Sequence, residues 1–231
     1  MTTHHPYWLV TISLALALAP VVIGLFTSFI KVHIVLSFFR SGLGAQQVPS
    51  GLIILGLAVA LTMTIMGPTI NEFQTRMNEF PLHKLEKSPS AIKKEEVNSL
   101  LQPWREFLEL HVGKRELLVF QKIAIQQKPK SEISELAEDG NSKASEIAWT
   151  VLLPAFVVTE LREAFTIGFV ILLPFLAIDL IVANLLAGVG MFMVSPVMIS
   201  LPLKVALFTF ADGWLLLSKG LTESYLLSGS L

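Results

Sequence analysis

Six charged side chains interrupt the apolar C-terminal third of this chain, and they are its best candidates for chemistry. They are Glu160, Arg162, Glu163, Asp179, Lys204 and Asp212. A charge at membrane depth costs at least about 2.5 kcal/mol, so such a residue pairs with another charge, faces water or faces protein. Charges of both signs, spaced this way, can form ion pairs between helices or between subunits, or line a path through protein.

Asp179 and Lys204 are the clearest pair, because a chain reversal is expected between Gly188 and Met193, roughly midway between them. The two side chains would then meet across a helical hairpin. In a second interpretation they pair between neighbouring subunits or line a conduit. Both interpretations require the two residues to lie near one another, so the sequence leaves the choice open.

The segment GMFMVSPVMISLPLK, residues 190–204, holds a second unusual group of side chains. Met191, Phe192 and Met193 are followed by two prolines, Pro196 and Pro202. A plain lipid-facing helix needs neither soft, polarisable methionines nor helix breakers. These residue types therefore raise the question of what else the segment contacts, and its composition alone does not answer it.

The sequence offers little for enzymatic or metal chemistry. It has no cysteine, no His-Glu-x-x-His or Gly-x-Ser-x-Gly motif, and no phosphate loop. His4 and His5 form a terminal pair that lacks a third metal ligand. We therefore expect a protein that is not an enzyme and has no metal site or cofactor. The net charge of −1 gives no reason to expect a nucleic-acid partner.

Composition places the chain among membrane proteins, since 53% of its residues are hydrophobic and only 15% are charged. The long apolar blocks are residues 7–30, 51–68, 148–159 and 164–210. A spanning helix needs about 20 apolar residues, so the first block qualifies and the others are short or broken, as at Pro174. The first block has no preceding Lys or Arg and no cleavage site before Lys31, so we expect it to be retained rather than removed as a signal peptide.

Three regions follow from this pattern: a hydrophobic helical hairpin over 1–68, a polar insert over 69–147, and broken hairpins over 148–231. The insert holds most of the charged residues. Apolar side chains recur there at helical spacing over 97–108 and 117–123, which predicts two amphipathic helices joined near 111–113. Pro103 fits the first turn of a helix or a restart. The polar flanks of these helices are predicted to be mobile.

Orientation is predicted from Lys31 and Arg40, which lie between the first two apolar blocks with no acidic residue nearby. The positive-inside rule then makes this connection cytoplasmic. The N-terminus and the polar insert would face the other side, which in a bacterium is the periplasm.

Two long segments resemble one known family. They are TSFIKVHIVLSFFRSGLGAQQVPSG followed by MGP, and LLPAFVVTELREAFTIGFVILLPFLAIDLIVANLLAGVGMFMVSPVMISLPLKVALFTFADGW. Both are similar to signatures of the FliP/SctR family of type III secretion export proteins. The resemblance covers residues 27–68 and 150–217, and the insert agrees more loosely. The missing signal peptide and Asn184 resemble the injectisome branch (SctR, YscR-like) more than flagellar FliP.

The resemblance implies an all-α fold of broken, kinked helical hairpins that assemble into a helical, multi-subunit export gate. It implies about five copies of this chain, joined by SctS/FliQ-like and SctT/FliR-like subunits, with SctU/FlhB-like and SctV/FlhA-like components nearby. Unfolded secreted proteins would pass through the centre. The assembly would sit at the bacterial inner membrane among lipid and project toward the periplasm, so some apolar blocks would face other subunits.

Within that family the loop at Met191, Phe192 and Met193 resembles a gasket that constricts the pore, with ordinary core filling as the alternative. Two departures stand out: Gly51 replaces a frequent Asn, and Phe192 interrupts a run usually written as three methionines. The competing function is a polytopic secondary transporter, in which Glu160, Asp179 and Lys204 would form a proton relay around broken helices.

Overall fold

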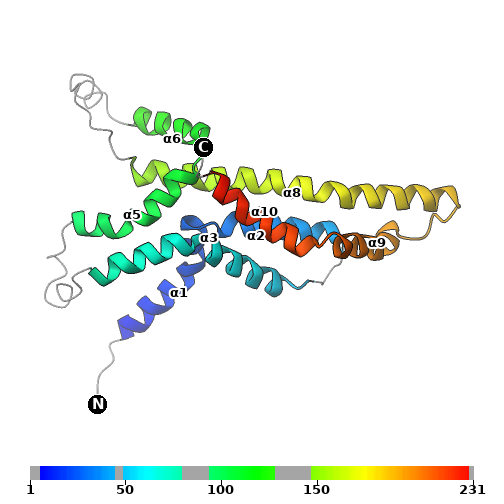
Figure 1. Cartoon of the computed structure of the whole chain (residues 1–231), viewed down its shortest axis with the longest axis horizontal. Coiled ribbons are helices and arrows are strands. Elements are labelled where there is room, and N and C mark those ends of the chain that lie inside the picture. The colour runs from blue at the N-terminus through cyan, green and yellow to red at the C-terminus, as the bar shows by residue number, and fades with distance from the viewer. Residues whose placement is uncertain (1–5, 45–48, 80–93, 128–146, 229–231) are drawn as a thin grey trace, which may run out of the picture.

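The computed structural model describes residues 6–44, 49–79, 94–127 and 147–228, and these ranges contain helices and no strand (Figure 1). The all-α prediction is therefore confirmed. The helices are α1 (Pro6–Phe26), α2 (Phe29–Leu43), α3 (Gly51–Glu79), α5 (Lys94–His111), α6 (Lys114–Gln127), α8 (Trp149–Gly188), α9 (Pro196–Phe210) and α10 (Gly213–Ser228).

Helices α2 and α8 pack closely against each other at the centre of the molecule. Helices α3 and α10 add residues to the same apolar core. Small residues allow this approach. A Cβ atom added at Gly168 of α8 would lie 2.5 Å from the ring of Phe38 on α2. Val35 and Leu36 of α2 are fully buried in this core. Helix α8 is therefore the central helix, and α2, α5, α6 and α9 pack against it.

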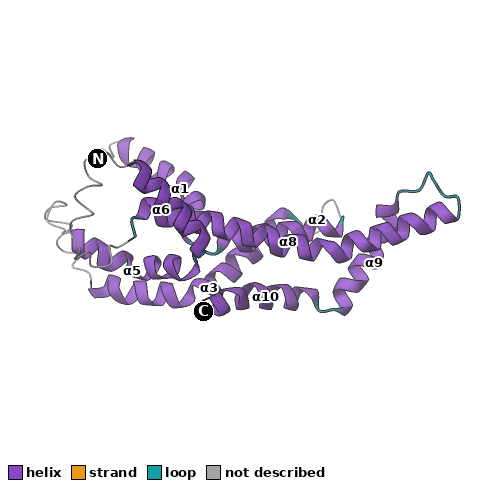
Figure 2. Ribbon diagram, turned by 90° about the horizontal axis from the view of Figure 1, so that it is seen from above, coloured by secondary structure: helices purple, strands orange, loops and turns teal. Residues whose placement is uncertain are grey.

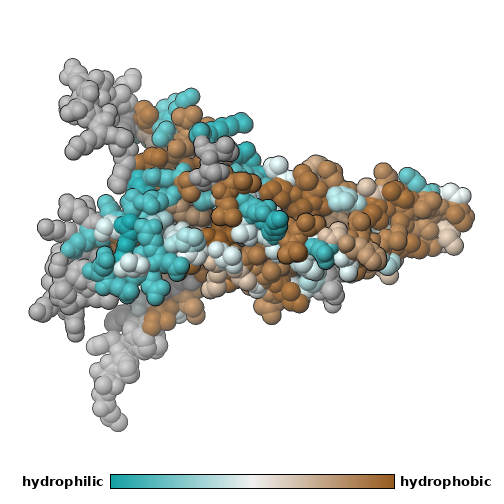
Figure 3. Space-filling model, in the orientation of Figure 1, coloured by the Kyte–Doolittle hydropathy of each residue, from teal (hydrophilic) through white to brown (hydrophobic). Residues whose placement is uncertain are grey.

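A long hairpin made of α8 and α9 extends away from this core, and its loop forms one end of the molecule (Figure 2). Gly190 turns the chain there with φ of +79°, a conformation that residues with a side chain rarely adopt. The visible surface of this half is mostly hydrophobic, whereas hydrophilic residues gather at the opposite end (Figure 3). The hairpin therefore presents apolar surface that the chain does not cover by itself.

The predicted breaks in the C-terminal region are only partly correct. The chain does reverse after Gly188, but α8 continues without interruption through Pro154 and Pro174, and α9 continues through Pro202. Glu160 also lies inside α8 rather than between two blocks. A long apolar helix tolerates an internal proline where neighbouring helices and local adjustments satisfy the freed backbone groups. A sequence pattern alone does not show those neighbours.

The expected spans also need correction. The first apolar block is not one helix, because α1 ends at Phe26 and α2 begins at Phe29. The Thr27 hydroxyl accepts a hydrogen bond from the Phe29 backbone N–H at this break. In the described residues, α3 and α8 are each long and apolar enough to cross a membrane. The pair α9 and α10, bent by 62°, would make a third span if it crosses as one.

The polar insert forms the two helices that its periodicity predicts, α5 and α6, joined at Val112 and Gly113. Pro103 lies inside α5 and neither starts nor restarts a helix, which corrects that prediction. Helix α3 continues through residue 68, the boundary expected before the insert, to Glu79. The polar flanks predicted to be mobile fall mainly outside the described residues.

Candidate functional site

A buried cation at the centre of the molecule organises the first cluster of charges. Lys31 of α2 is 1% exposed, and its Nζ lies 3.2 Å from Oε1 of Glu160 and 2.7 Å from Oε2 of Glu163, both on α8. Helical spacing places Lys31 on the same face of α2 as Val35, so this face must pack against α8. The Coulomb attraction offsets part of the cost of burying these charges.

Tyr225 of α10 joins this cluster from the C-terminal end of the chain. Its hydroxyl donates a hydrogen bond to Oε2 of Glu160, and Nζ of Lys31 lies 3.8 Å from the centre of its ring. The cluster therefore includes one cation–π contact as well as the ion pair. Three helices that are distant in sequence, α2, α8 and α10, are fixed to one another by these contacts.

His111, at the end of α5, connects the polar insert to α10. Its Nδ1 lies 2.7 Å from the Phe107 carbonyl oxygen and its Nε2 lies 3.1 Å from the Tyr225 carbonyl oxygen. A neutral imidazole can donate to only one of these oxygens. Burial nevertheless lowers the pKa of His111 below its usual value of 6.5, although both carbonyl contacts oppose the shift.

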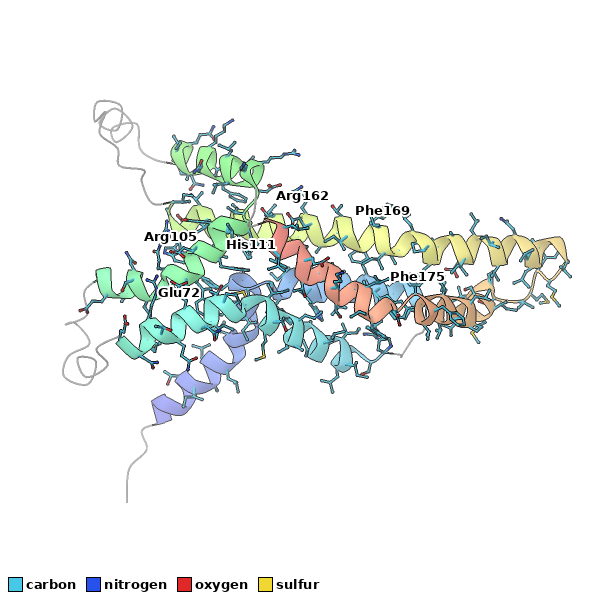
Figure 4. All side chains as sticks on the ribbon, viewed as in Figure 1. Glu72, Arg105, His111, Arg162, Phe169 and Phe175 are labelled. Carbon is cyan, nitrogen blue, oxygen red and sulfur yellow. The ribbon has the colours of Figure 1, made fainter. Side chains whose placement is uncertain are left out.

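Arg162 faces away from the central cluster and ties α6 to α8. Its Nε lies 2.9 Å from Oε1 of Glu116, whose side chain is buried (Figure 4). The backbone N–H of Gly113 also donates to the Thr159 hydroxyl at 2.9 Å. These two contacts anchor the start of α6 on the outer side of α8.

A second ion pair lies farther along the hairpin, and it joins a buried lysine to a partly exposed aspartate. Nζ of Lys204 on α9 lies 2.7 Å from Oδ2 of Asp179 on α8, and it donates to the Gly42 carbonyl oxygen at 2.9 Å. Ser200 donates a hydrogen bond of 2.5 Å to the other oxygen of Asp179. Lys204 is 1% exposed, so removing its charge would leave Asp179 without its cation and the Gly42 carbonyl without this donor. This contact joins α8 and α9 within one chain.

The loop between α8 and α9 exposes large apolar side chains on the surface of the chain. Phe192 is 81% exposed, Met193 is fully exposed, and Met191 is half exposed. The inner side of the hairpin is different, since Phe175 is buried against α2 while Phe169 stays exposed on the outer side (Figure 4). The sequence left open that these side chains fill the core. Their exposure shows that they are not part of the core of this single chain.

The structure separates the predicted charges into distinct groups. Glu160 and Glu163 share Lys31, Arg162 pairs with Glu116, and Asp179 pairs with Lys204. Asp212 takes no part in these pairs and lies at the turn between α9 and α10, where its φ is +48°. A pair that crosses between subunits remains a prediction.

The orientation prediction rested on a wrong premise. Lys31 and Arg40 do not lie in a loop: both belong to α2, and Lys31 is buried in the central cluster. A buried, paired cation does not report which side of a membrane a loop faces. In the described residues no group of acidic and histidine side chains could hold a metal ion. His4 and His5 lie outside those residues.

Sequence reasoning missed two members of the central cluster, Lys31 and Tyr225. A signal for Lys31 was present, since it is a lone charge between apolar residues and shares a helix face with Val35 and Phe39, which are buried. No comparable signal marked Tyr225. Its role depends on how α10 folds back onto α8, which only the tertiary structure shows.

Comparison with known proteins gives consistent matches over most of the chain. Residues 12–221 match the FliP family. The chain is 38% identical over 210 residues to the flagellar biosynthetic protein FliP of Bacillus subtilis, covering 90% of this chain and 87% of the relative. It is 37% identical over 221 residues to the virulence protein YscR of Salmonella typhimurium, covering 95% and 97%.

A third relative, the Yop proteins translocation protein R of Yersinia pestis, is 38% identical over 212 residues, covering 91% of this chain and 92% of the relative. Flagellar and virulence proteins thus match at similar identity. The match includes the segments that hold Lys31, Glu160, Asp179 and Lys204 as well as the exposed loop. This chain belongs to the FliP family, which includes the SctR-type secretion proteins.

Proposed function

We propose that the chain is a core subunit of a type III secretion export apparatus. Several copies, about five, assemble with SctS-like and SctT-like subunits around the entry pore through which unfolded proteins cross the bacterial inner membrane. SctU-like and SctV-like components neighbour this assembly at the bacterial inner membrane, and the pore projects toward the periplasm. Asn184 and its neighbours favour the injectisome branch over the flagellar one.

The exposed loop at the end of the α8–α9 hairpin carries this proposal. Residues 189–195 are not helical and expose Met191, Phe192 and Met193. Irregular backbone at membrane depth is tolerated only where it is buried in protein or lines a cavity. A ring of such loops from several copies supplies that environment, and flexible methionines can close around an axis and still yield to varied side chains.

The long apolar hairpin supports assembly in the same way. Its outer surface exposes Phe165, Phe169 and Leu180, so one copy alone leaves a large apolar face uncovered. Neighbouring copies and partner subunits would cover this face. The charges that interrupt the hairpin are then compatible with a protein environment, because each of them except Asp212 already has a partner within the chain.

The transporter alternative receives less support from the positions of the charges. A relay needs Glu160 and Asp179 to exchange protons along a continuous path. Both lie on α8, where 19 residues of helix separate them by about 28 Å. Each is also held by its own lysine, Lys31 or Lys204. The arrangement favours two structural ion pairs over one relay.

Co-expression with the SctS-like and SctT-like proteins of the same genome tests the proposal. Purification through a tag on the SctT-like subunit should recover several copies of this chain per copy of that subunit, as measured by native mass spectrometry. The matched control is the chain expressed alone and reconstituted into vesicles. A monomer or dimer that moves a small solute there, with no recovery by the tagged subunit, would establish the transporter instead.

A further inference from the structure

The outer face of α6 combines positive charge with apolar surface. Its exposed side chains include Lys114, Arg115, Lys122, Leu118, Val119 and Ile125. The only acidic residue of this helix, Glu116, is buried and paired with Arg162. Leu118, Lys122 and Ile125 share one face at helical spacing, and Leu118 and Ile125 are each more than half exposed. The described residues leave this basic apolar face uncovered.

A groove on another part of the chain is a candidate contact for this face. It has a volume of about 770 Å³ and lies between α3, α5 and α10. Its wall carries three carboxylates. Glu72 and Glu109 are paired within the chain with Arg76 and Arg105, whereas Glu106 accepts a hydrogen bond from the neutral amide of Gln102. Phe107 and Leu110 supply apolar surface beside these carboxylates, and Leu110 is 54% exposed. The groove therefore offers the α6 face an apolar wall and one carboxylate, Glu106, that is not paired with a cation among the described residues.

The α6 face cannot enter the groove of its own chain. The Glu116–Arg162 ion pair and the Gly113–Thr159 hydrogen bond hold the start of α6 against α8. In both ribbon views α6 lies on one side of α8, with α3 on the other side (Figures 1 and 2). The two surfaces are therefore available for a contact between copies and not within one copy.

We propose that the outer face of α6 docks into the α3–α5–α10 groove of a neighbouring copy of this chain. The proposal rests on the multi-copy assembly proposed above and names the surfaces that join adjacent copies. Lys122 faces Glu106, while Leu118 and Ile125 cover Phe107 and Leu110. Electrostatic complementarity of this kind fixes the register of an interface and suppresses wrong partners.

The contact joins two different surfaces, so it is heterologous rather than two-fold symmetric. A heterologous contact repeats from copy to copy and produces a ring or a helical array. Because α6 is anchored on α8, its position in the polar insert would then set the rotation between neighbouring copies. The insert thereby acts as a connector between copies, in addition to its contacts within the chain.

Disulfide cross-linking tests the contact directly, because the chain contains no cysteine. Ile125→Cys on α6 and Thr69→Cys in the groove would be combined in the complex with the SctS-like and SctT-like subunits. Mild oxidation should produce a ladder of covalently linked copies. Each single variant should stay monomeric on a denaturing gel, as should the control pair Ile125→Cys with Lys219→Cys, since Lys219 is exposed outside the groove.

Charge reversal adds a test of complementarity in the same double-cysteine background. Lys122→Glu or Glu106→Lys alone should lower the cross-linked fraction about tenfold, because each places like charges together. The two reversals combined should restore most of the ladder. Lys219→Glu is the matched control, and it should leave the ladder unchanged.

The outcomes separate this proposal from the proposed function. A complex that contains several copies but gives no ladder, or a ladder that ignores both reversals, overturns the α6 contact and leaves the export role intact. Failure of the copies to associate at all overturns both. A ladder that is lost on single reversal and returns on double reversal establishes the contact.

Discussion

Tyr225 in the last helix donates a hydrogen bond to Glu160, which lies 65 residues earlier in the chain. The same carboxylate pairs with Lys31 of α2, so one buried acidic group connects the beginning, the middle and the end of the described chain. Because Glu160 is buried, each of its partners contributes to keeping it compatible with the interior. The relationship makes α10 part of the core rather than a loose terminal helix.

Tyr225→Phe should destabilise the folded chain by about 1.5–3 kcal/mol, because it removes a hydrogen bond to a charged group and keeps the ring. The midpoint of thermal unfolding in detergent measures the loss. Thr222→Val is the control, since the Thr222 hydroxyl donates to the Ser218 carbonyl oxygen of the same helix. An equal, small effect of both variants would contradict the role assigned to Tyr225.

Lys204→Ala should reduce assembly of the complex, because it leaves Asp179 without its cation and the Gly42 carbonyl without this donor, while the Ser200 hydroxyl still bonds to Asp179. Removal of one partner of a fully buried pair costs about 3–5 kcal/mol, and the cost here should be smaller because water reaches Asp179. Native gels would compare the amount of assembled complex with that of Lys219→Ala, a change at an exposed lysine. If both variants assembled to the same extent, neither the hairpin pair nor a pair between subunits would be important for assembly.

Met191→Ala combined with Met193→Ala should leave the complex intact and raise membrane conductance to small ions. The expected reason is that each truncation is repeated around the ring and opens a gap at its axis. The exposure of both side chains in a single copy favours this result over a packing defect. Planar-bilayer recordings of the purified complex measure the conductance.

The packing alternative for these methionines predicts the reverse. Truncation of a buried methionine costs about 2–5 kcal/mol at each site, so the complex would fall apart. Loss of assembly without a measurable leak would therefore remove the gasket interpretation. Val10→Ala, a truncation of another exposed apolar residue far from the loop in sequence, serves as the control for assembly and conductance.

The stability of the chain should decrease as the pH falls below about 6.5, because burial lowers the pKa of His111 in the folded state. Between that lowered pKa and 6.5 the unfolded chain binds a proton that the folded chain does not bind, so protonation favours unfolding. Above 6.5 the contribution of this group is complete. Thermal unfolding at pH 8 and at pH 5.5 measures the difference.

His111→Gln is the matched comparison for the pH experiment, because glutamine can donate a hydrogen bond but does not titrate in this range. The difference in thermal midpoint between the two pH values should be smaller in this variant than in the unchanged chain. Lys31 and Glu163 also face His111 electrostatically, with opposite effects on its pKa. An identical pH dependence in both proteins would exclude His111 as its source.

Local patterns were sufficient for several parts of the fold. Helical spacing in the insert predicted α5 and α6 and their junction, because an amphipathic helix carries its period in its own residues. The sequence also indicated which segments are apolar, and the long motifs around Glu160 and Lys204 indicated the family. These properties depend on residues that are close together in the chain.

Other features depended on contacts between distant residues, and the sequence did not reveal them. Pro174 and Glu160 looked like interruptions, yet α8 passes through both, since neighbouring helices satisfy the backbone and Lys31 supplies the opposite charge. Lys31 looked like a loop charge that reports membrane orientation, yet it is buried. A charge pattern is local, whereas the partner of a buried charge can be more than a hundred residues away.

The sequence by itself determined that this protein is helical, apolar and related to FliP, and it marked Asp179 and Lys204 as residues that lie near one another. Only the tertiary structure decided that this pair forms within one chain, that Tyr225 completes the cluster at Glu160, and that Met193 is exposed. The physical reason is that burial and pairing are properties of packed surfaces. Those surfaces exist only after helices from distant parts of the chain have come together.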